Sequence, residues 1–196
     1  MADPSSHALV VGGTGMLYDV SLNLAARGYA TSVIARDPVR LEELRARAAA
    51  VGGRIEPMPV DYGETGSLEV ALRERRDLLG PPGLVVAWVH GSAPTALPTL
   101  VRWLREEQTA ARLVHVVGSA VADPSADSAD ELTSKLSGSS IRLQTVILGF
   151  VLEGEAGTQR SRWLTDREIS AGVLRAIDSG SPRSIVGQVE PWHLRP

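Results

Sequence analysis

The stretch Val10–Tyr18, which reads VVGGTGMLY, decides how the rest of the chain is interpreted. It continues a short apolar run and contains three glycines, Gly12, Gly13 and Gly15. Glycines between a strand and a helix let the backbone turn tightly and come close to a phosphate. The spacing matches the G-x-G-x-x-G pattern of a dinucleotide-binding turn, except that Tyr18 stands in place of the last glycine.

The missing glycine leaves two interpretations of this turn. The last glycine normally lets the helix pack closely on the strand, so Tyr18 adds bulk at that contact. The ring either points aside, with a small shift of the helix, or fills part of the nucleotide cleft and weakens binding. Because a helix N-terminus also offers free amides to an anion, we favour a working phosphate cradle formed by Gly12, Gly13, Thr14, Gly15, Met16 and Leu17.

Short apolar runs alternate with helical patterns along most of the chain. The runs predict strands at residues 7–12, 31–35, 54–60, 84–90, 113–118, 141–148 and 184–189. Helices are expected after the glycine turn up to Gly28, and over residues 38–52, 67–79, 95–108, 128–137 and 166–179. This alternation predicts an α/β fold of the Rossmann type, a doubly wound and mostly parallel sheet of about seven strands with helices on both faces. We interpret residues 1–196 as a single dinucleotide-binding domain.

Composition narrows the classes of partner. A formal net charge of −3 provides no basic surface for nucleic acid, and the absence of cysteine excludes disulfides and thiolate metal sites. We predict no metal site. The first residues lack the pattern of a signal peptide, and no apolar stretch approaches the roughly 20 residues of a membrane span. The sequence therefore predicts a cytoplasmic protein with no membrane or nucleic-acid partner, and leaves homo-oligomerisation open.

Two further positions favour a nucleotide cleft. Arg36 ends the second predicted strand in VIARD, where the adenosine ribose of a bound dinucleotide is expected. Ala35 stands where an acidic residue would bind the ribose hydroxyls, and Arg36 can pair with a 2′-phosphate, which favours NADP over NAD. Asp61 and Tyr62 follow the third strand, where a side chain can meet the adenine edge. The alternatives are a solvated arginine beside Asp37 and a turn-forming aspartate.

With GGTGML after the first strand, VIAR at the second and VDY after the third, the chain resembles the short-chain dehydrogenase/reductase family. It is most similar to shortened, atypical members. The resemblance spans most of the chain, including VVGSA at 116–120 and VILGF at 146–150, and is most specific in the first 62 residues. It implies an NADP-dependent oxidoreductase that transfers a hydride to a small carbonyl or imine substrate.

The resemblance also implies catalytic residues, and here the sequence departs from the family. Ser119 matches the family's serine, which follows the fifth strand. The family's proton-transferring tyrosine and the lysine four residues later have no match, because the only tyrosines are Tyr18, Tyr29 and Tyr62. Lys135 lies at about the right distance after Ser119, but its predicted helix is short, and a solvated surface lysine is the favoured interpretation.

His90 and Gly91 follow the fourth strand, near the expected nicotinamide end of the cleft. We expect both to contact the cofactor, with His90 and Ser119 as the candidate catalytic residues. The charge of a histidine changes near neutral pH, so His90 can donate a proton to a substrate. The alternatives are a histidine that only bonds the cofactor or a loop carbonyl, and a serine that only forms a turn.

The sequence leaves open the role of one segment near the end of the chain and suggests a packing role for another. The polar segment 153–164, EGEAGTQRSRWL, occupies the position of the family's substrate loop. It either closes over the cofactor or lets Trp163 pack ahead of a helix capped by Thr165. Trp192 is expected to anchor the terminal segment by packing.

Three functions follow from these observations. The first is an NADP(H)-dependent reductase that works without the usual tyrosine. The second is a noncatalytic NADP(H)-binding sensor or interaction module that has lost its catalytic acid. The third is a scaffold without a ligand. The missing tyrosine supports the second, the glycine turn with Arg36 supports the first two, and no residue identifies the substrate.

Overall fold

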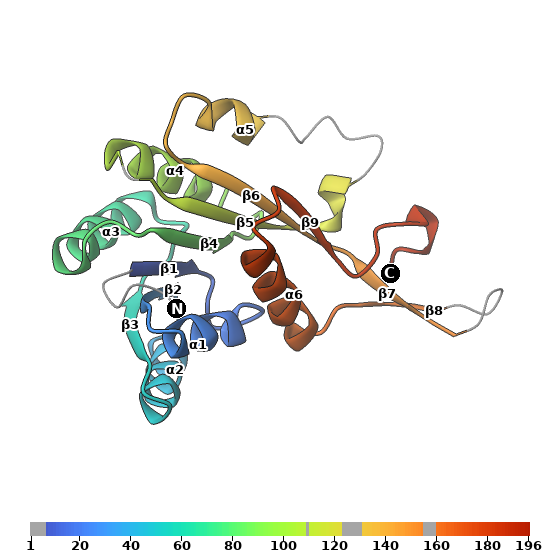
Figure 1. The fold of residues 1–196 in the computed structure, drawn as a ribbon, viewed down its shortest axis with the longest axis horizontal. Helices are drawn as coiled ribbons and strands as arrows, with labels where there is room; N and C mark the ends of the chain where they lie inside the picture. Colours follow the sequence, from blue (N-terminus) through green and yellow to red (C-terminus); the bar gives the residue numbers. More distant parts are fainter. Residues whose placement is uncertain (1–6, 109, 123–130, 155–159) are drawn as a thin grey trace.

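The computed structural model describes residues 7–108, 110–122, 131–154 and 160–196 (Figure 1). Seven parallel strands form one sheet in the order β3-β2-β1-β4-β5-β6-β9. The strands are β1 (His7–Val11), β2 (Ala30–Ala35), β3 (Arg54–Pro59), β4 (Leu84–Trp88), β5 (Arg112–Gly118), β6 (Arg142–Leu148) and β9 (Arg183–Val186). The predicted doubly wound α/β fold is therefore confirmed.

Helices cover both faces of the sheet. One layer contains α1 (Tyr18–Ala26), α2 (Pro38–Ala50) and α6 (Asp166–Ser179). The other contains α3 (Thr65–Leu79), α4 (Ala96–Glu106) and α5 (Glu131–Leu136). The prediction for α5 began at residue 128, and residues 128–130 lie outside the described part of the chain. Within the described residues, no helix combines the length and apolar character needed to cross a membrane.

Strand β1 shows how the sequence fills both halves of the core. Successive side chains of a strand point to opposite faces of the sheet. Ala8 and Val10 accordingly pack in the core beneath α1, α2 and α6, whereas Leu9 and Val11 pack beneath α3 and α4. All four are fully or almost fully buried. A continuous apolar run is therefore required here, since neither face of the strand meets water.

Helix ends lie close to where the sequence signals place them. Pro38 begins α2, and the Asp37 side chain accepts hydrogen bonds from the amides of Val39 and Arg40. Thr165 caps α6 in a capping box, in which its hydroxyl and the Glu168 carboxylate each accept from the other's amide. These bonds satisfy amides that a helix N-terminus leaves without partners. The predicted helix start at residue 38 and the predicted cap at Thr165 are confirmed, and the cap by Asp37 is an addition.

A two-stranded antiparallel arm extends from the sheet beyond β6. It consists of β7 (Phe150–Glu153) and β8 (Arg160–Trp163), and Figure 1 shows it projecting beside the C-terminal tail. Gly149 lets the backbone of this crossing approach the tail, because a Cβ there would lie 2.0 Å from the Gln188 carbonyl oxygen. The sequence analysis treated residues 153–164 as a polar loop, so the pairing of β7 with β8 is a difference from that expectation.

Helix α6 is held against the rest of the sheet by two contacts. Its Gly172 lies so close to β9 that an added Cβ would meet Val186 Cγ1 at 2.3 Å. At the other end, Arg27 after α1 donates two hydrogen bonds to the Asp178 carboxylate, of which the Nη2 to Oδ2 bond is 3.0 Å long. The first contact brings helix and strand together, and the second joins α6 to α1.

Candidate functional site

The candidate site lies at the carboxyl edge of the parallel sheet. The connections after β1, β2, β3, β4 and β5 all begin at this edge, because the strands run in one direction. Strand β1 stands between β2 and β4, so the chain runs outward from it to both sides, and such a switch in strand order opens a crevice for ligands. The sequence-predicted site residues lie along these connections, as Arg36, Asp61, His90 and Ser119 do.

The glycine turn has the geometry of a phosphate cradle at Gly12 and Gly15. Gly12 has a φ of 79°, and a Cβ there would lie 2.8 Å from the Trp88 carbonyl oxygen, so only glycine fits. At Gly15 no atom lies within 4 Å of an added Cβ, and the backbone faces open space. A ligand can therefore approach the main chain at Gly15.

Gly13 packs the helix against the sheet, the task that the sequence pattern assigns to the position of Tyr18. A Cβ on Gly13 would lie 2.6 Å from Val33 Cγ1 and 2.7 Å from Ser21 Oγ. The buried Ser21 hydroxyl donates to the carbonyl oxygens of Gly13 and Leu17, both at 3.1 Å. Close packing is thus achieved by Gly13, five residues before the position that the pattern predicts.

Tyr18 points aside and leaves the cavity described below free. Its half-buried ring packs against the core beneath α1 and α2, under the guanidinium of Arg47. Tyr18 does not line the cavity at the ends of β2, β3 and β4. Of the two interpretations of the missing glycine, the geometry agrees with the first.

The start of α1 fits the pyrophosphate of a dinucleotide. Among the described residues, no acceptor pairs with the amides of residues 13–17, which precede the first helical hydrogen bonds. The helix begins at Tyr18 without a side-chain cap. Free amides, a helix N-terminus and open space at Gly15 are the features with which proteins bind phosphate. The cradle residues therefore fit the group that the sequence predicts.

A cavity of about 520 Å³ continues this edge across the ends of β2, β3 and β4. Three of its lining residues were predicted to bind the cofactor on the adenosine side, namely Arg36, Asp61 and Tyr62. Arg36 is exposed, and no described carboxylate pairs with it. Asp61 uses one oxygen, Oδ1, to accept from the Gly63 amide at 2.9 Å. The structure thus brings a cation and a carboxylate to one cavity.

His90 lines the same cavity and is exposed to solvent. Its Nδ1 atom lies 2.9 Å from Ser92 Oγ and accepts from the Ser92 amide at 3.2 Å. Nδ1 faces Ser92, whereas Nε2 has no hydrogen-bond partner in the part of the chain that the structure describes and is available to a ligand. Gly91 is exposed beside it, and no atom lies within 4 Å of an added Cβ there.

Trp88 is a site residue that sequence reasoning missed. Its indole Cδ1 lies 3.6 Å from the Cβ position of Gly12, and its Cη2 lies 4.0 Å from that of Gly118. The ring therefore bridges the ends of β1 and β5 while lining the cavity. In the sequence it is one apolar residue in a predicted strand, and only its place as the last residue of β4 signals a ligand contact.

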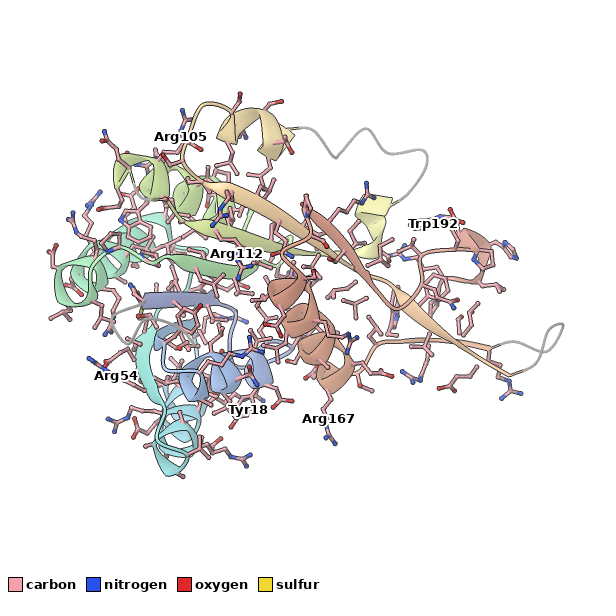
Figure 2. All side chains as sticks on the ribbon, viewed as in Figure 1. Tyr18, Arg54, Arg105, Arg112, Arg167 and Trp192 are labelled. Atoms are coloured by element: carbon pink, nitrogen blue, oxygen red, sulfur yellow. The ribbon has the colours of Figure 1, made fainter. Side chains whose placement is uncertain are left out.

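Ser119 follows β5 and is buried, with its hydroxyl already bonded. Arg195 Nε donates to Ser119 Oγ at 2.8 Å, although the two residues are 76 positions apart. The guanidinium carbon of Arg195 lies 5.2 Å from the ring centre of Trp163 and 5.1 Å from that of Trp192. Ser119 therefore belongs to a cluster with the arm and the tail, of which Figure 2 labels Trp192.

The arm that supplies Trp163 is fixed by charge. Arg162 donates through both Nη atoms to the two oxygens of Glu168, at 2.8 and 3.0 Å, and through Nε to Glu153 at 2.6 Å. Hydrogen bonds from Arg162 and Thr165 lower the pKa of Glu168 to about 2. Arg162 thus has two carboxylate partners, whereas no described carboxylate pairs with Arg195.

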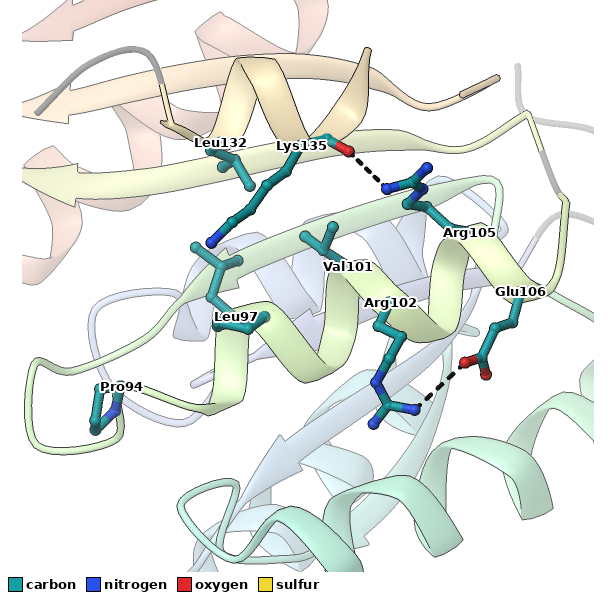
Figure 3. A pocket seen from close by; sticks show the side chains of 9 residues that line it. Pro94, Leu97, Val101, Arg102, Arg105, Glu106, Leu132 and Lys135 are labelled. Carbon is teal, nitrogen blue, oxygen red and sulfur yellow. Dashed lines mark hydrogen bonds and ion pairs between the residues drawn. The ribbon is translucent and has the colours of Figure 1, made fainter. Parts of the chain in front are cut away.

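Lys135 lies in a different cavity from the predicted site. That cavity, of about 760 Å³, runs between α4 and α5 and is lined by Leu97, Val101 and Leu132 among others (Figure 3). The Lys135 carbonyl oxygen accepts a hydrogen bond from Arg105 at 3.0 Å. Ser119 does not line this cavity, and Lys135 does not line the one that Arg36 and His90 share, which agrees with the interpretation of Lys135 as a residue outside the site.

Comparison with known proteins agrees with the fold. No protein-family model matches the sequence, and no curated protein is significantly similar to it. Among solved structures, the chain is similar to a short chain dehydrogenase from Bacillus anthracis, with 12% identity, a TM-score of 0.74 and 100% of both chains covered. It is similar to a short-chain dehydrogenase/reductase from Mycobacterium marinum, with 15% identity, a TM-score of 0.73 and 95% of each chain covered.

A third similar structure was solved with a cofactor. It is a short-chain dehydrogenase from Sphingobium yanoikuyae in complex with NADPH, with 18% identity, a TM-score of 0.70 and coverage of 96% of this chain and 91% of that one. At identities this low, the similarity is one of backbone fold and does not extend to the side chains of the site. The chain therefore has the fold of the short-chain dehydrogenase/reductases.

Proposed function

We propose that this protein is an NADP(H)-dependent oxidoreductase that reduces a small carbonyl or imine compound. The proposal rests on one observation: the features that a dinucleotide needs follow one another along one edge of the sheet. In the order of the strands, the open backbone at Gly15 and the amides before α1 lie between Arg36 and the strand ends that hold His90 and Ser119, and neither Arg36 nor these amides have a partner among the described residues. A dinucleotide needs these features in this order. We retain residues 1–196 as one dinucleotide-binding domain, and the cytoplasmic location stays a prediction.

Each part of this edge has a task in the proposal. The amides of residues 13–17 would hold the pyrophosphate, with the N-terminus of α1 adding a partial positive charge. Arg36 would pair with a 2′-phosphate through its planar guanidinium, and Asp61 and Tyr62 would line the adenine. Gly91 and Trp88 would lie beside the nicotinamide half. When bound, NADPH supplies a hydride to an electrophilic carbon.

His90 is the proposed proton donor. When the ring is protonated, Nδ1–H gives up the bond that it accepts from the Ser92 amide and donates instead to Ser92 Oγ at 2.9 Å, while Nε2–H faces the substrate. Reduction of a C=O or C=N bond places a hydride on carbon and a proton on the heteroatom. The proton leaves His90 Nε2, and the exposed ring regains it from water. The proposal replaces the tyrosine that the sequence lacks with this imidazole.

Calorimetric titration of the purified protein with NADPH and NADH tests the cofactor. Arg36→Ala should weaken NADPH tenfold or more, because a charge-assisted hydrogen bond is worth about 1.5–3 kcal/mol, and should leave NADH unchanged. Arg40→Ala, which removes an exposed cation from the next turn, is the matched control and should change neither. Equal losses for both cofactors in Arg36→Ala would contradict the assignment of NADP.

Turnover separates the enzyme from a noncatalytic binder. The sensor hypothesis rests on one observation, the absence of any tyrosine after Tyr62. A panel of carbonyl and imine compounds with NADPH should give turnover that His90→Ala lowers by about 10²–10⁴-fold. Tight NADPH binding without turnover of any compound would favour the sensor. Binding of neither cofactor would leave only the scaffold.

A further inference from the structure

The cluster around Arg195 places a cation at the substrate end of the edge. Three segments that are far apart in the sequence meet there, namely Ser119 after β5, Trp163 of β8 and the tail with Trp192 and Arg195. The indole of Trp88 reaches Gly118, the residue before Ser119, and also lines the cavity with Arg36. The cluster is thus continuous with the proposed cofactor cleft, at the end opposite Arg36.

Arg195 is held in place yet keeps two donors free. The Arg195 Cζ atom lies 5.1 Å from the ring centre of Trp192 and 5.2 Å from that of Trp163, and the Nε bond to Ser119 is a third contact that holds the side chain. Among the described residues, neither Nη atom makes a hydrogen bond and no carboxylate forms an ion pair with Arg195. A planar guanidinium with two free, parallel donors matches the geometry of a carboxylate.

Arg162 of the adjoining arm provides a contrast with Arg195. Arg162 has the same side chain and lies one residue before Trp163, but its Nη atoms are bonded to Glu168 and its Nε to Glu153. An arginine that serves only to fix the arm uses its donors on protein carboxylates. Arg195 instead donates one hydrogen bond to a neutral hydroxyl and forms no ion pair with a described carboxylate.

We propose that Arg195 binds the carboxylate of the substrate, so that the site takes small carbonyl compounds that carry a carboxylate, such as 2-oxo acids. The inference rests on the proposed function for the reacting carbonyl, whereas the anion site itself is defined by the cluster. Arg195 is a specificity-determining residue, and Trp163 and Trp192 position it. Ser119 Oγ, which accepts from Arg195, keeps its own hydrogen to donate to a substrate oxygen.

Binding of acid and ester pairs tests this assignment without the cofactor. Ligand-observed NMR would measure pyruvate, 2-oxobutyrate and phenylpyruvate, each against its methyl ester. The ester keeps the size and loses the charge. At least one acid should bind wild-type protein tenfold or more tightly than its ester, because the guanidinium contact is charge-assisted. Equal binding of every acid and its ester would overturn the proposal.

Variants assign the preference to Arg195. Arg195→Gln should abolish the difference between acid and ester, and Arg195→Lys should retain only part of it because an ammonium lacks the planar pair of donors. Arg167→Gln removes the same charge from an exposed site that points away from the sheet on α6 (Figure 2) and should keep the full preference. An unchanged preference in Arg195→Gln would also overturn the proposal.

A separate NADPH titration distinguishes this inference from the proposed function. Arg195→Gln should bind NADPH as the wild type does, because Arg36 and the cradle hold the cofactor at the other end. Acid preference without NADPH binding would refute the reductase and retain the anion site. NADPH binding and turnover of uncharged carbonyl compounds, with no preference for acids, would refute the anion site and retain the reductase.

Discussion

The ring of Tyr18 lies under the guanidinium of Arg47, whose Cζ atom is 5.9 Å from the ring centre. This contact joins the first turn of α1 to α2 and turns the ring away from the cavity that Arg36 lines. The residue that interrupts the glycine pattern therefore contributes to helix packing. Its effects on stability and on cofactor binding can be separated.

We expect Tyr18→Ala to lower the free energy of unfolding by about 1–2 kcal/mol, from lost apolar burial and a lost cation–π contact. The affinity for NADPH should stay within about twofold of the wild type, since the ring lines no part of the cavity. Urea unfolding and calorimetric titration measure the two quantities. Tyr18→Phe, which keeps the ring, is the control. A large loss of affinity in a folded Tyr18→Ala would show that the ring contacts the cofactor.

Two alanine substitutions in the glycine turn should differ in kind. Gly13→Ala places a Cβ 2.6 Å from Val33 Cγ1 and should cost about 1–3 kcal/mol of stability through overpacking. Gly15→Ala meets no atom within 4 Å and should fold normally, yet weaken NADPH because its methyl group occupies the approach to the backbone. Urea unfolding with NADPH titration checks both. Similar profiles for the two variants would contradict the division of tasks between these glycines.

The contact between α6 and β9 predicts a compensating pair. Gly172→Ala should destabilise the protein by about 1–3 kcal/mol, because its Cβ would lie 2.3 Å from Val186 Cγ1. Val186→Ala removes both methyl groups and leaves a small cavity. The double variant should be more stable than the sum of the two losses predicts, which a double-mutant cycle of unfolding free energies measures. Additive losses would show that the two positions do not share this space.

Stability should fall as the pH is lowered from about 6.5 to about 4. Burial lowers the pKa of His115 on β5 to about 4, and burial is also the main cause of the lowered pKa of His7. The unfolded chain protonates these rings first, so it binds more protons than the folded chain within this window. His115 alone accounts for at most about 3 kcal/mol at 1.36 kcal/mol per unit of pKa. No such loss is expected above pH 6.5.

His115→Leu should flatten this dependence. Urea unfolding at several pH values between 7 and 4 would then show a smaller decrease in the variant than in the wild type. The remaining decrease belongs to His7, and below pH 4.5 to acids such as Asp178, whose pKa the Arg27 hydrogen bond lowers. An identical slope in variant and wild type would mean that His115 is accessible to protons in the folded state.

The positions of the sheet strands along the chain could be predicted from the sequence because local signals agree with one another. Apolar runs such as residues 84–90 mark strands buried on both faces, and Pro38 and Thr165 mark helix starts. The same local reasoning predicted the cradle, and it placed Arg36 at the end of the second strand, where the structure has it beside the cavity. It failed where contacts are distant, because no local signal indicates that Arg195 returns to Ser119 across 76 positions.

Two other features could not be predicted from the sequence pattern. Gly13, and not the residue at position 18, allows the close packing of helix on sheet. The buried hydroxyl of Ser21, one turn into α1, leaves no room for a Cβ at Gly13. Strand β8, RSRW, has no apolar alternation that would predict a strand, and only its pairing with β7 makes it one. In both cases the partner in space, and not the residue itself, determines the outcome.

The position of Trp88 gives the molecule its own optical reporter. Its indole bridges the ends of β1 and β5, while Trp163 and Trp192 lie at the substrate end, so three of the four tryptophans border the proposed cleft. Trp103 is buried in the layer of α3 and α4. Indole emission overlaps the absorption of reduced nicotinamide. Binding of the reduced cofactor should therefore quench the fluorescence of Trp88 by energy transfer, and the remaining emission should come mainly from Trp103. Intrinsic fluorescence can therefore follow cofactor arrival without a label, and Trp88→Phe would identify the emitter.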